Sequence, residues 1–154
     1  MPTEKESLAS PEIWENKTIL IVDDDEGARE LGRAIFRRQS ATTRVLTAND
    51  GEEAIEKFKE VTAKGGKIDL VITDYHMPNK DGPQLISWLR SQENLPQPLV
   101  VLASGERFTG LNESQRQEAA KKYQADIVTE KPYSPLQLIQ KIIQAWQSQK
   151  SAVN

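Results

Sequence analysis

The chain has 154 residues, a length that suits one domain with a substantial hydrophobic core. Its 20 basic and 23 acidic residues give a net charge of −3, so we expect no direct binding to nucleic acid. The absence of cysteine excludes disulfides, thiolate metal sites and thiol catalysis. The apolar runs are too short for a membrane span and the polar start lacks a signal-peptide pattern, so we expect a cytoplasmic protein without a membrane partner.

The first segment of the chain is polar and precedes the residues whose hydrophobic patterns predict strands and helices. Residues 1 to about 16 contain two prolines and show no periodicity, so we expect a flexible N-terminal arm there. Trp14 either docks this arm on the domain or is exposed. We expect one folded domain over residues 17–148 and a C-terminal tail over 149–154. The last predicted helix runs nearly to the end of the sequence, so we expect no output domain in this chain.

Short apolar runs predict the strands. Three of them are strong, at residues 19–22, 68–73 and 99–103, and only the second contains a charged residue, Asp69. Continuous rather than alternating hydrophobicity indicates strands that are covered on both faces, which is typical of a parallel sheet. Val45-Leu46 and Ile127-Val128 mark two weaker strand candidates.

Apolar residues at helical spacing predict a helix after each strand. The first helix covers residues 26–39, with an apolar stripe made by Ala28, Leu31, Ile35 and Phe36. The others cover residues 51–63, 83–92, 113–123 and 135 to about 147. Five strands, each followed by a helix, predict an α/β fold in (βα)5 order. Right-handed crossovers then give a doubly wound parallel five-stranded sheet with helices on both faces.

Polar side chains gather where the predicted strands end. Asp23 and Asp24 follow the first strand, Asp74 ends the third, Ser104 follows the fourth and Lys131 follows the fifth. Ligands of open α/β sheets bind outside the carboxyl ends of the strands, so these side chains should share one site.

The chemistry of this set favours a metal ion and a phosphoryl group. Three like carboxylates facing one ammonium should repel one another and raise the pKa of a carboxyl group. A hard divalent cation relieves that repulsion, and Mg²⁺, with Mn²⁺ as a substitute, prefers such oxygen ligands. A carboxylate there can act as a nucleophile that forms an acyl phosphate. The metal, Ser104 and Lys131 would then each meet a phosphoryl oxygen.

The same residues resemble a known family. Residues 19–25 (Ile-Leu-Ile-Val-Asp-Asp-Asp) resemble the opening of response-regulator receiver domains of two-component signalling. Residues 74–82 match their D-x-x-M-P-x-x-D-G loop, and residues 102–105 and 131–133 resemble their hydroxyl and lysine-proline-aromatic motifs. The resemblance spans residues 17 to about 148. It implies a flavodoxin-like strand order of 2-1-3-4-5.

The resemblance also implies roles for single residues. Asp74 would be the phosphoacceptor. Asp24 and Asp74 would bind Mg²⁺ directly, together with the backbone carbonyl of His76, while Asp23 would act largely through water. Ser104 and Lys131 would hold the phosphoryl group and report its presence.

Partners are implied in the same way. The phosphoryl donor would be a sensor histidine kinase or a histidine phosphotransfer protein, and the switched domain would regulate an unknown target protein as a monomer or weak dimer. Such a domain is not an enzyme in the usual sense, although it assists its own phosphorylation and dephosphorylation. His76 and Glu106 are candidate modulators of dephosphorylation, although the side chain of His76 alone is best interpreted as solvated.

One departure from the family concerns switching. The family often has an aromatic residue three positions before the lysine, where this chain has Val128. The usual aromatic coupling is therefore in question, and Val128 and Tyr133 are the candidate switch-coupling residues. Asp25 is best interpreted as the cap of the following helix.

Three other functions fit the sequence less well. An aspartate-nucleophile phosphatase has a D-x-D-x-T/V signature, of which residues 23–27 are a degenerate match with Gly27 at the last position. A flavin carrier needs a phosphate loop rich in Ser, Thr or Gly after the first strand, and none is present. A phosphorylation-independent pseudo-receiver, a pure interaction module, is disfavoured by the complete set of acidic, hydroxyl and lysine residues.

Overall fold

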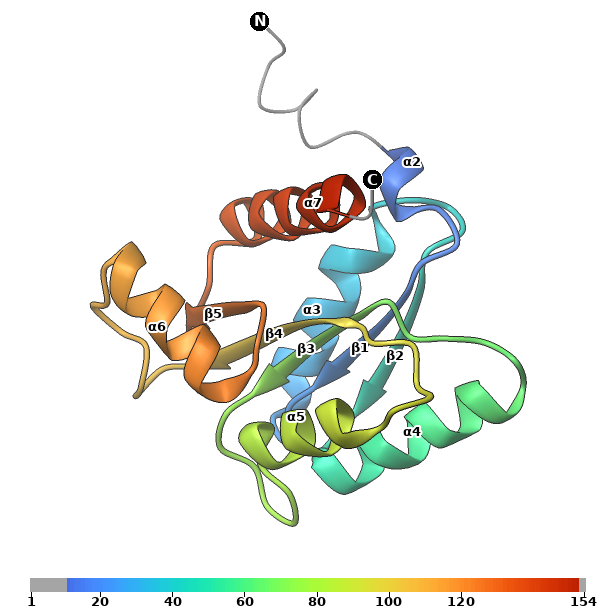
Figure 1. The fold of residues 1–154 in the computed structure, drawn as a ribbon, viewed down its shortest axis with the longest axis horizontal. Helices are drawn as coiled ribbons and strands as arrows, with labels where there is room; N and C mark the ends of the chain where they lie inside the picture. The colour runs from blue at the N-terminus through green and yellow to red at the C-terminus, as the bar shows by residue number, and fades with distance from the viewer. Residues whose placement is uncertain (1–10, 153–154) are drawn as a thin grey trace, which may run out of the picture.

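A five-stranded parallel sheet forms the centre of the computed structural model, which describes residues 11–152 (Figure 1). The strands are β1 (Thr18–Val22), β2 (Arg44–Ala48), β3 (Leu70–Asp74), β4 (Leu99–Ser104) and β5 (Ile127–Glu130). Their order across the sheet is β2-β1-β3-β4-β5, which confirms the predicted flavodoxin-like order. The helices are α2 (Pro11–Trp14), α3 (Glu26–Arg37), α4 (Gly51–Ala63), α5 (Gly82–Ser91), α6 (Glu113–Tyr123) and α7 (Pro135–Ala152).

Short polar side chains set the first residues of four helices. Asp25 and Asp50 accept hydrogen bonds from backbone N–H groups in the first turns of α3 and α4, each at 2.8 Å. Asp81 and Asn112 form capping boxes with Gln84 and Gln115 at the starts of α5 and α6. Each cap satisfies backbone donors that the first helical turn leaves free. The interpretation of Asp25 as a helix cap is confirmed.

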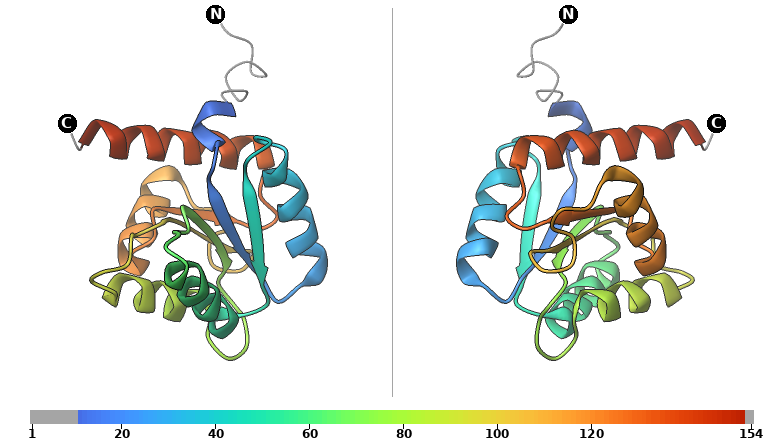
Figure 2. Two further views of the ribbon diagram at one scale, coloured as in Figure 1. Left: turned by 90° about the vertical axis from the view of Figure 1, so that its right-hand side faces the viewer. Right: turned by 90° about the vertical axis from the view of Figure 1, so that its left-hand side faces the viewer.

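The helices cover both faces of the sheet (Figure 2). Helices α3 and α7 pack on one face, against Ile19 and Ile21 of β1 among others. Helices α4, α5 and α6 pack on the other face, against Leu20 and Val22 of the same strand. Both sides of the strand are therefore buried in hydrophobic layers, which explains its unbroken apolar run.

The predicted apolar stripe of α3 is wrong at Leu31, whose side chain is 63% exposed. The helix instead buries Gly32 and Phe36. A Cβ atom at Gly32 would lie 3.3 Å from the side chain of Ile21, so the glycine lets the helix approach the sheet closely. This close contact turns Leu31 away from the core.

The N-terminal segment is ordered where the structure describes it. Helix α2 lies within the predicted flexible arm, and Trp14 is fully buried against Phe36 and Trp146, with ring centroids 5.9 and 4.9 Å away. The arm prediction is therefore corrected for residues 11–14, because Trp14 docks the segment on α7. Residues 1–10 lie outside the described part of the chain.

Most of the predicted C-terminal tail is helical instead. Helix α7 continues through Ala152, so residues 149–152 of the predicted tail are helical; residues 153–154 lie outside the described part. None of the helices described here is long and apolar enough to cross a membrane.

Candidate functional site

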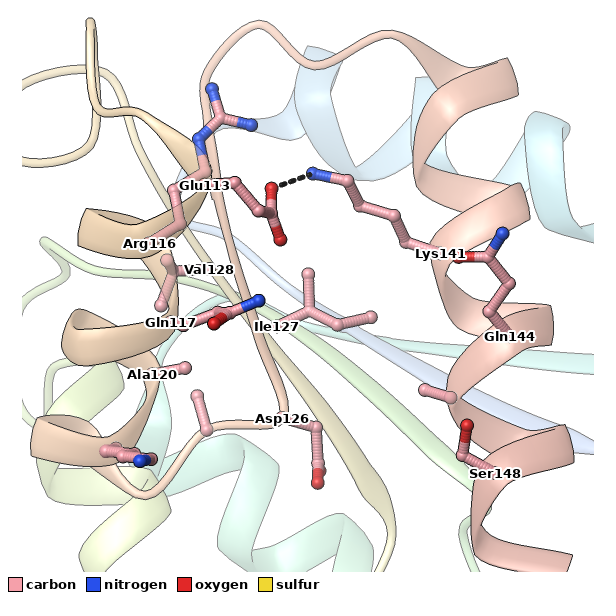
Figure 3. A pocket seen from close by; sticks show the side chains of 13 residues that line it. Glu113, Arg116, Gln117, Ala120, Asp126, Ile127, Val128, Lys141, Gln144 and Ser148 are labelled. Atoms are coloured by element: carbon pink, nitrogen blue, oxygen red, sulfur yellow. Dashed lines mark ion pairs between the residues drawn. The ribbon is translucent and has the colours of Figure 1, made fainter. Parts of the chain in front are cut away.

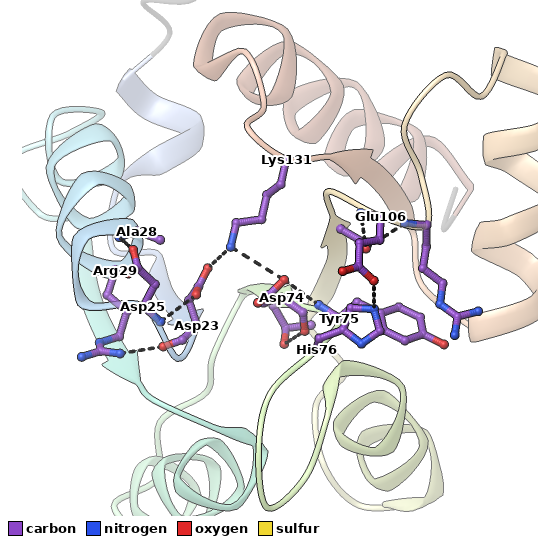
Figure 4. A network of polar contacts seen from close by, with 12 residues as sticks. Asp23, Asp25, Ala28, Arg29, Asp74, Tyr75, His76, Glu106 and Lys131 are labelled. Atoms are coloured by element: carbon purple, nitrogen blue, oxygen red, sulfur yellow. Dashed lines mark hydrogen bonds and ion pairs between the residues drawn. The ribbon is translucent and has the colours of Figure 1, made fainter.

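The polar residues predicted to share a site lie at the carboxyl ends of four strands. Figure 4 shows Asp23, Asp74 and Lys131 side by side there. Asp23 directly follows β1, Asp74 ends β3, Ser104 ends β4, and Lys131 directly follows β5. The β3–β4 register aligns Asp74 with Ala103, the residue before Ser104. The parallel pairing thus brings side chains that are far apart in sequence to one edge of the sheet.

Three carboxylates form the acidic part of the site. One oxygen each from Asp23, Asp24 and Asp74 lies within 4.8 Å of the other two. Asp23 is buried, Asp74 is partly buried, and Asp24 is exposed. We call this set the acidic trio. Oxygen donors at this separation fit a hard divalent cation such as Mg²⁺, with an open side toward solvent for water or a phosphoryl oxygen.

Burial is the main influence on the ionisation of Asp74. It raises the pKa of the carboxyl group above its ordinary value, and the charges of Asp23 and Asp24 raise it further. Lys131 and the N–H of Tyr75, which donates to Asp74 Oδ1 at 3.0 Å, both oppose this rise. The upward direction expected from repulsion is therefore present, but desolvation contributes more than the like charges.

Lys131 bridges two members of the acidic trio. Its Nζ atom lies 2.5 Å from Asp23 Oδ2 and 3.7 Å from Asp74 Oδ1. Burial alone would lower the pKa of the lysine, but the hydrogen bond and charge of Asp23, with the charge of Asp74, raise it above its ordinary value. The side chain therefore stays an ammonium ion at neutral pH. The Lys131–Pro132 peptide bond is cis.

Asp23 is held from several directions besides Lys131. Its Oδ1 accepts from the N–H of Asp25 at 3.0 Å, and its backbone carbonyl accepts from Nη1 of Arg29 at 2.7 Å. The carboxylate is thereby fixed at the inner end of the site, where Figure 4 shows it beside Lys131.

Ser104 connects the site to the loop that follows β4. The side chain is buried, and its Oγ accepts hydrogen bonds from the N–H groups of Glu106 at 3.2 Å and Arg107 at 3.0 Å. The hydroxyl oxygen therefore holds the first residues of that loop in place.

Comparison with known proteins agrees with this arrangement. Residues 19–143 match the family model described as the response regulator receiver domain. The chain belongs to this family. It is 30% identical over 92% of its length to "Hybrid signal transduction histidine kinase D" of Dictyostelium discoideum, of which it covers 8%. It is 32% identical over 82% of its length to "Response regulator GtcR" of Aneurinibacillus migulanus, of which it covers 46%.

Solved structures give the same assignment. Chemotaxis response regulator CheY4 of Vibrio cholerae is 25% identical, with a TM-score of 0.65 over 84% of this chain and 98% of that one. A putative two-component system response regulator with a GGDEF domain is also 25% identical, with a TM-score of 0.72 over 90% of this chain and 52% of that one. The curated relatives are more than twice as long as the matched region, and their remaining parts have no counterpart in this alignment.

His76 and Glu106 flank the mouth of the receiver site. Both side chains are exposed, and His76 Nε2 lies 3.5 Å from Glu106 Oε2 (Figure 4). His76 also lines a shallow hollow of about 350 Å³ together with Asp24 and Asp81. The exposed side chain of His76 agrees with its interpretation as solvated.

The two candidate coupling residues lie in different surroundings. Val128 is buried and lines a polar hollow of about 500 Å³ between α6 and α7, with Arg116 and Lys141 on its walls (Figure 3). That hollow contains no member of the acidic trio. Tyr133 instead lines a hollow of about 140 Å³ that also includes Asp74. Burial raises the pKa of Tyr133, and the charge of Asp23 adds to this effect.

Gly82, the last residue of the 74–82 loop motif, lies against the site for a reason that the sequence did not reveal. A Cβ atom there would lie 2.4 Å from the backbone oxygen of Asp74 and 2.7 Å from Leu102 Cδ1. The Gly82 N–H donates to the carbonyl of Tyr75 at 2.9 Å. Only glycine allows α5 to begin this close to the end of β3.

A second fixing point for the loop after Asp74 was also missed. The carboxylate of Asp50 accepts from Asn79 Nδ2 at 2.8 Å, and the N–H of Gly51 donates to the carbonyl of Lys80 at 3.0 Å. These contacts attach the loop to the start of α4. The sequence signal was the Asp50-Gly51 pair, which repeats the Asp-Gly pair at residues 81–82.

Proposed function

We propose that this receiver domain is a phosphorylation-dependent switch whose phosphoacceptor is Asp74. The observation that carries the proposal is the acidic trio, with Asp74 at the end of the central strand and the ammonium of Lys131 within 3.7 Å of it. The open side of the Asp74 carboxylate would let a phosphoryl donor reach it. Its partial burial would shield the resulting aspartyl phosphate from water. The donor would be a phosphohistidine of a sensor histidine kinase or a histidine phosphotransfer protein.

The proposed step transfers one phosphoryl group. An Asp74 carboxylate oxygen forms a bond to phosphorus while the phosphorus–nitrogen bond of the donor breaks, and the departing imidazole takes a proton from solvent. The product is an aspartyl phosphate. Mg²⁺ held by Asp23, Asp24, Asp74 and the backbone carbonyl of His76, or Mn²⁺ in its place, would supply charge neutralisation.

Protein groups would then hold the transferred group. The Lys131 ammonium can exchange part of its contact with the acidic trio for a phosphoryl oxygen, because it already lies between Asp23 and Asp74. The hydroxyl of Ser104 would donate to another oxygen. Val128 and Tyr133, one beside α6 and α7 and the other beside Asp74, remain the proposed switch-coupling residues.

The rate of dephosphorylation would depend on the mouth of the site. His76 and Glu106, exposed and 3.5 Å apart beside the site, would lie near the path of a hydrolytic water, so their size and charge would modulate the lifetime of the phosphoryl group. The domain would assist the gain and loss of its own phosphoryl group rather than turn over a separate substrate. We place it in the cytoplasm, as a monomer or weak dimer that regulates a target protein.

Phosphorylation of purified protein tests the proposal. Incubation with acetyl phosphate and Mg²⁺ should add one phosphoryl group by intact-mass spectrometry, and chelator should abolish the addition. Asp74→Asn should take none, whereas Asp81→Asn, which retains an oxygen to cap α5, should be labelled like the wild type. Labelling that survives Asp74→Asn refutes the assignment, and a wild type that takes no phosphoryl group from any donor leaves the pseudo-receiver alternative.

A further inference from the structure

Strand β2 forms one edge of the sheet, and among residues 11–152 it pairs with β1 alone. The N–H of Arg44 donates to the carbonyl of Lys17, at the start of β1, at 2.9 Å. Backbone groups alternate in direction along a strand, so the N–H and C=O groups of Arg44 and Leu46 face β1. Those of Val45 and Thr47 point outward, where they can pair with a further strand.

Strand β2 lacks the features that usually prevent such pairing. Its five residues contain no proline, and its register with β1 runs along the whole strand without a bulge. Its one charged residue, Arg44, is at the first position, and Val45, Leu46 and Thr47 are half-buried. Edge strands that stay single are commonly interrupted by prolines, bulges or central charges. This edge is therefore open to another strand.

Helix α3 contacts both β1 and β2 and lies beside this edge (Figure 2). Its flank with Leu31 lines the hollow that includes Tyr133 and Asp74, on the side of β3. The opposite flank, toward the outer side of β2, carries charged residues at helical spacing: Glu26, Glu30, Arg33 and Arg37. Arg29 of the same flank donates instead to the carbonyl of Asp23. Along this flank the charge changes from acidic at the start of α3 to basic at its end.

Helix α4 has a similar flank on the other face of the sheet. Its residues Lys59 and Thr62 line a hollow with Trp88 of α5, and this side of the helix faces away from the edge. The opposite flank, toward the outer side of β2, carries a second charged series: Glu53, Lys57, Glu60 and Lys64. The sign of the charge alternates along this series.

Both series complement themselves when the helix is paired with an antiparallel copy. Every acidic side chain then faces a basic one: Glu26 with Arg37 and Glu30 with Arg33 in α3, and Glu53 with Lys64 and Lys57 with Glu60 in α4. None of these side chains takes part in an ion pair among the described residues. The charges on both sides of the edge thus fit a second copy of the same chain.

We propose that two copies of this chain join edge to edge through β2, antiparallel and related by a two-fold axis, into one continuous sheet. Leu46 of each copy lies at the axis, and Val45 of one copy faces Thr47 of the other. Each such pair exchanges both of its main-chain hydrogen bonds. The proposal concerns an interface and is independent of the role of Asp74.

The same axis brings the charged flanks together. An axis perpendicular to the sheet keeps each helix on its own face, so α3 meets α3 and α4 meets α4. Both helices contact β1 and β2, so the paired helix axes lie roughly 10 Å apart for strands spaced by about 4.8 Å, close to the usual distance of packed helices. Gly32, in the middle of the α3 series, lies against Ile21, the register partner of Thr47. The α3 series is therefore centred on β2.

Charge reversal tests the interface by sedimentation equilibrium of the full chain. Glu26→Arg and Arg37→Glu should each weaken the dimer about 10-fold or more, because the unfavourable contact occurs twice in a two-fold dimer. An equal mixture of the two variants should form a heterodimer with nearly the wild-type dissociation constant, since both contacts again join opposite charges. Lys59→Glu, on the flank of α4 that faces α5, is the matched control and should dimerise like the wild type.

Hydrogen exchange tests the strand pairing without any substitution. When the protein concentration is raised above the dissociation constant, the amides of Val45 and Thr47 should exchange more slowly. The amide of Leu46 faces β1 and should be protected at every concentration. Equal behaviour of all three amides contradicts pairing at this edge.

Three outcomes overturn the proposal. They are a wild type that stays monomeric at millimolar concentration, a dimer that neither charge reversal weakens, and a mixture of the two variants that does not recover. Asp74→Asn should dimerise like the wild type. A protein that dimerises in this way but takes no phosphoryl group refutes the proposed function and leaves this interface standing.

Discussion

Asp74 carries a negative charge that its surroundings only partly compensate. Lys131 lies closer to Asp23, at 2.5 Å, than to Asp74, at 3.7 Å. The strongest ion pair therefore belongs to the other aspartate, and burial keeps the pKa of Asp74 raised. The metal-free protein thus retains an unfavourable charge at the residue that we propose to be phosphorylated.

Asp74→Asn should stabilise the metal-free protein at neutral pH for this reason. We expect the melting temperature in chelator to rise by about 2–4 °C, which corresponds to about 1 kcal/mol for a domain of this size. Because the folded-state pKa of Asp74 lies above its unfolded value of 3.8, the cost of ionisation is absent below pH 3.8 and grows as the pH rises through the folded-state pKa. The advantage of the variant should therefore shrink as the pH falls toward 3.8.

Asp81→Asn is the matched control for this melting experiment, since it removes a carboxylate outside the acidic trio and keeps an oxygen for the cap. Its melting temperature should stay near that of the wild type. A loss of stability in Asp74→Asn would show that the contact with Lys131 outweighs burial and repulsion.

At the scale of the elements, β3 and α5 meet without space for a side chain. The Gly82 N–H contacts the Tyr75 carbonyl, and the position of its missing Cβ falls 2.4 Å from the backbone oxygen of Asp74. Helix α5 therefore fixes the end of β3, the strand that carries the proposed phosphoacceptor. The Asp50–Asn79 hydrogen bond performs a similar task for the following loop from the start of α4.

Gly82→Ala should push α5 away from β3. We expect a loss of about 1–3 kcal/mol in the free energy of unfolding, measured by urea titration, because backbone atoms have to move to admit the methyl group. The rate of phosphorylation by acetyl phosphate should fall as well. Gly27→Ala is the control: its Cβ would meet only the end of the Asp25 side chain, at 3.2 Å, so its stability should change little. Equal stability of the two variants would contradict the close contact.

At the scale of the whole molecule, the acidic trio exists only when β1 and β3 are paired. A metal ion that binds this trio therefore binds the folded state and stabilises it, by about 2.7 kcal/mol at a concentration of 100 times the dissociation constant. Metal affinity and folding stability are thereby coupled throughout the domain.

Asp24→Asn tests this coupling cleanly, because Asp24 is the exposed member of the trio. In chelator, its unfolding free energy should lie within about 0.5 kcal/mol of the wild type. In millimolar Mg²⁺, the wild type should gain stability and the variant should gain less, as measured by thermal melting. Asp25→Asn, which can still cap α3, should gain as much as the wild type. An equal gain in Asp24→Asn would exclude Asp24 as a metal ligand.

The sequence by itself determined the five strands, the helices between and after them, and the charged and hydroxyl residues at the site, although it did not reveal α2 or the roles of Gly82 and Asp50. Helix starts at Asp25, Asp81 and Asn112 are local, since each cap bonds to an N–H only three residues further on. Three of the strands, β1, β3 and β4, were visible as apolar runs because both of their faces are buried. Asp74 and Lys131 could be placed at one edge because parallel strands all end on the same side of the sheet.

Only the tertiary structure decided how these pieces act on one another. Helical spacing could not show that Gly32 rather than Leu31 faces the sheet, because that depends on how closely α3 approaches Ile21. The ionisation of Asp74 likewise depends on burial by distant segments. The contact between Tyr75 and Tyr123, which are 48 residues apart, follows from the packing of α6 beside the β4 loop. Such contacts depend on distances between elements, which no local pattern in the sequence specifies.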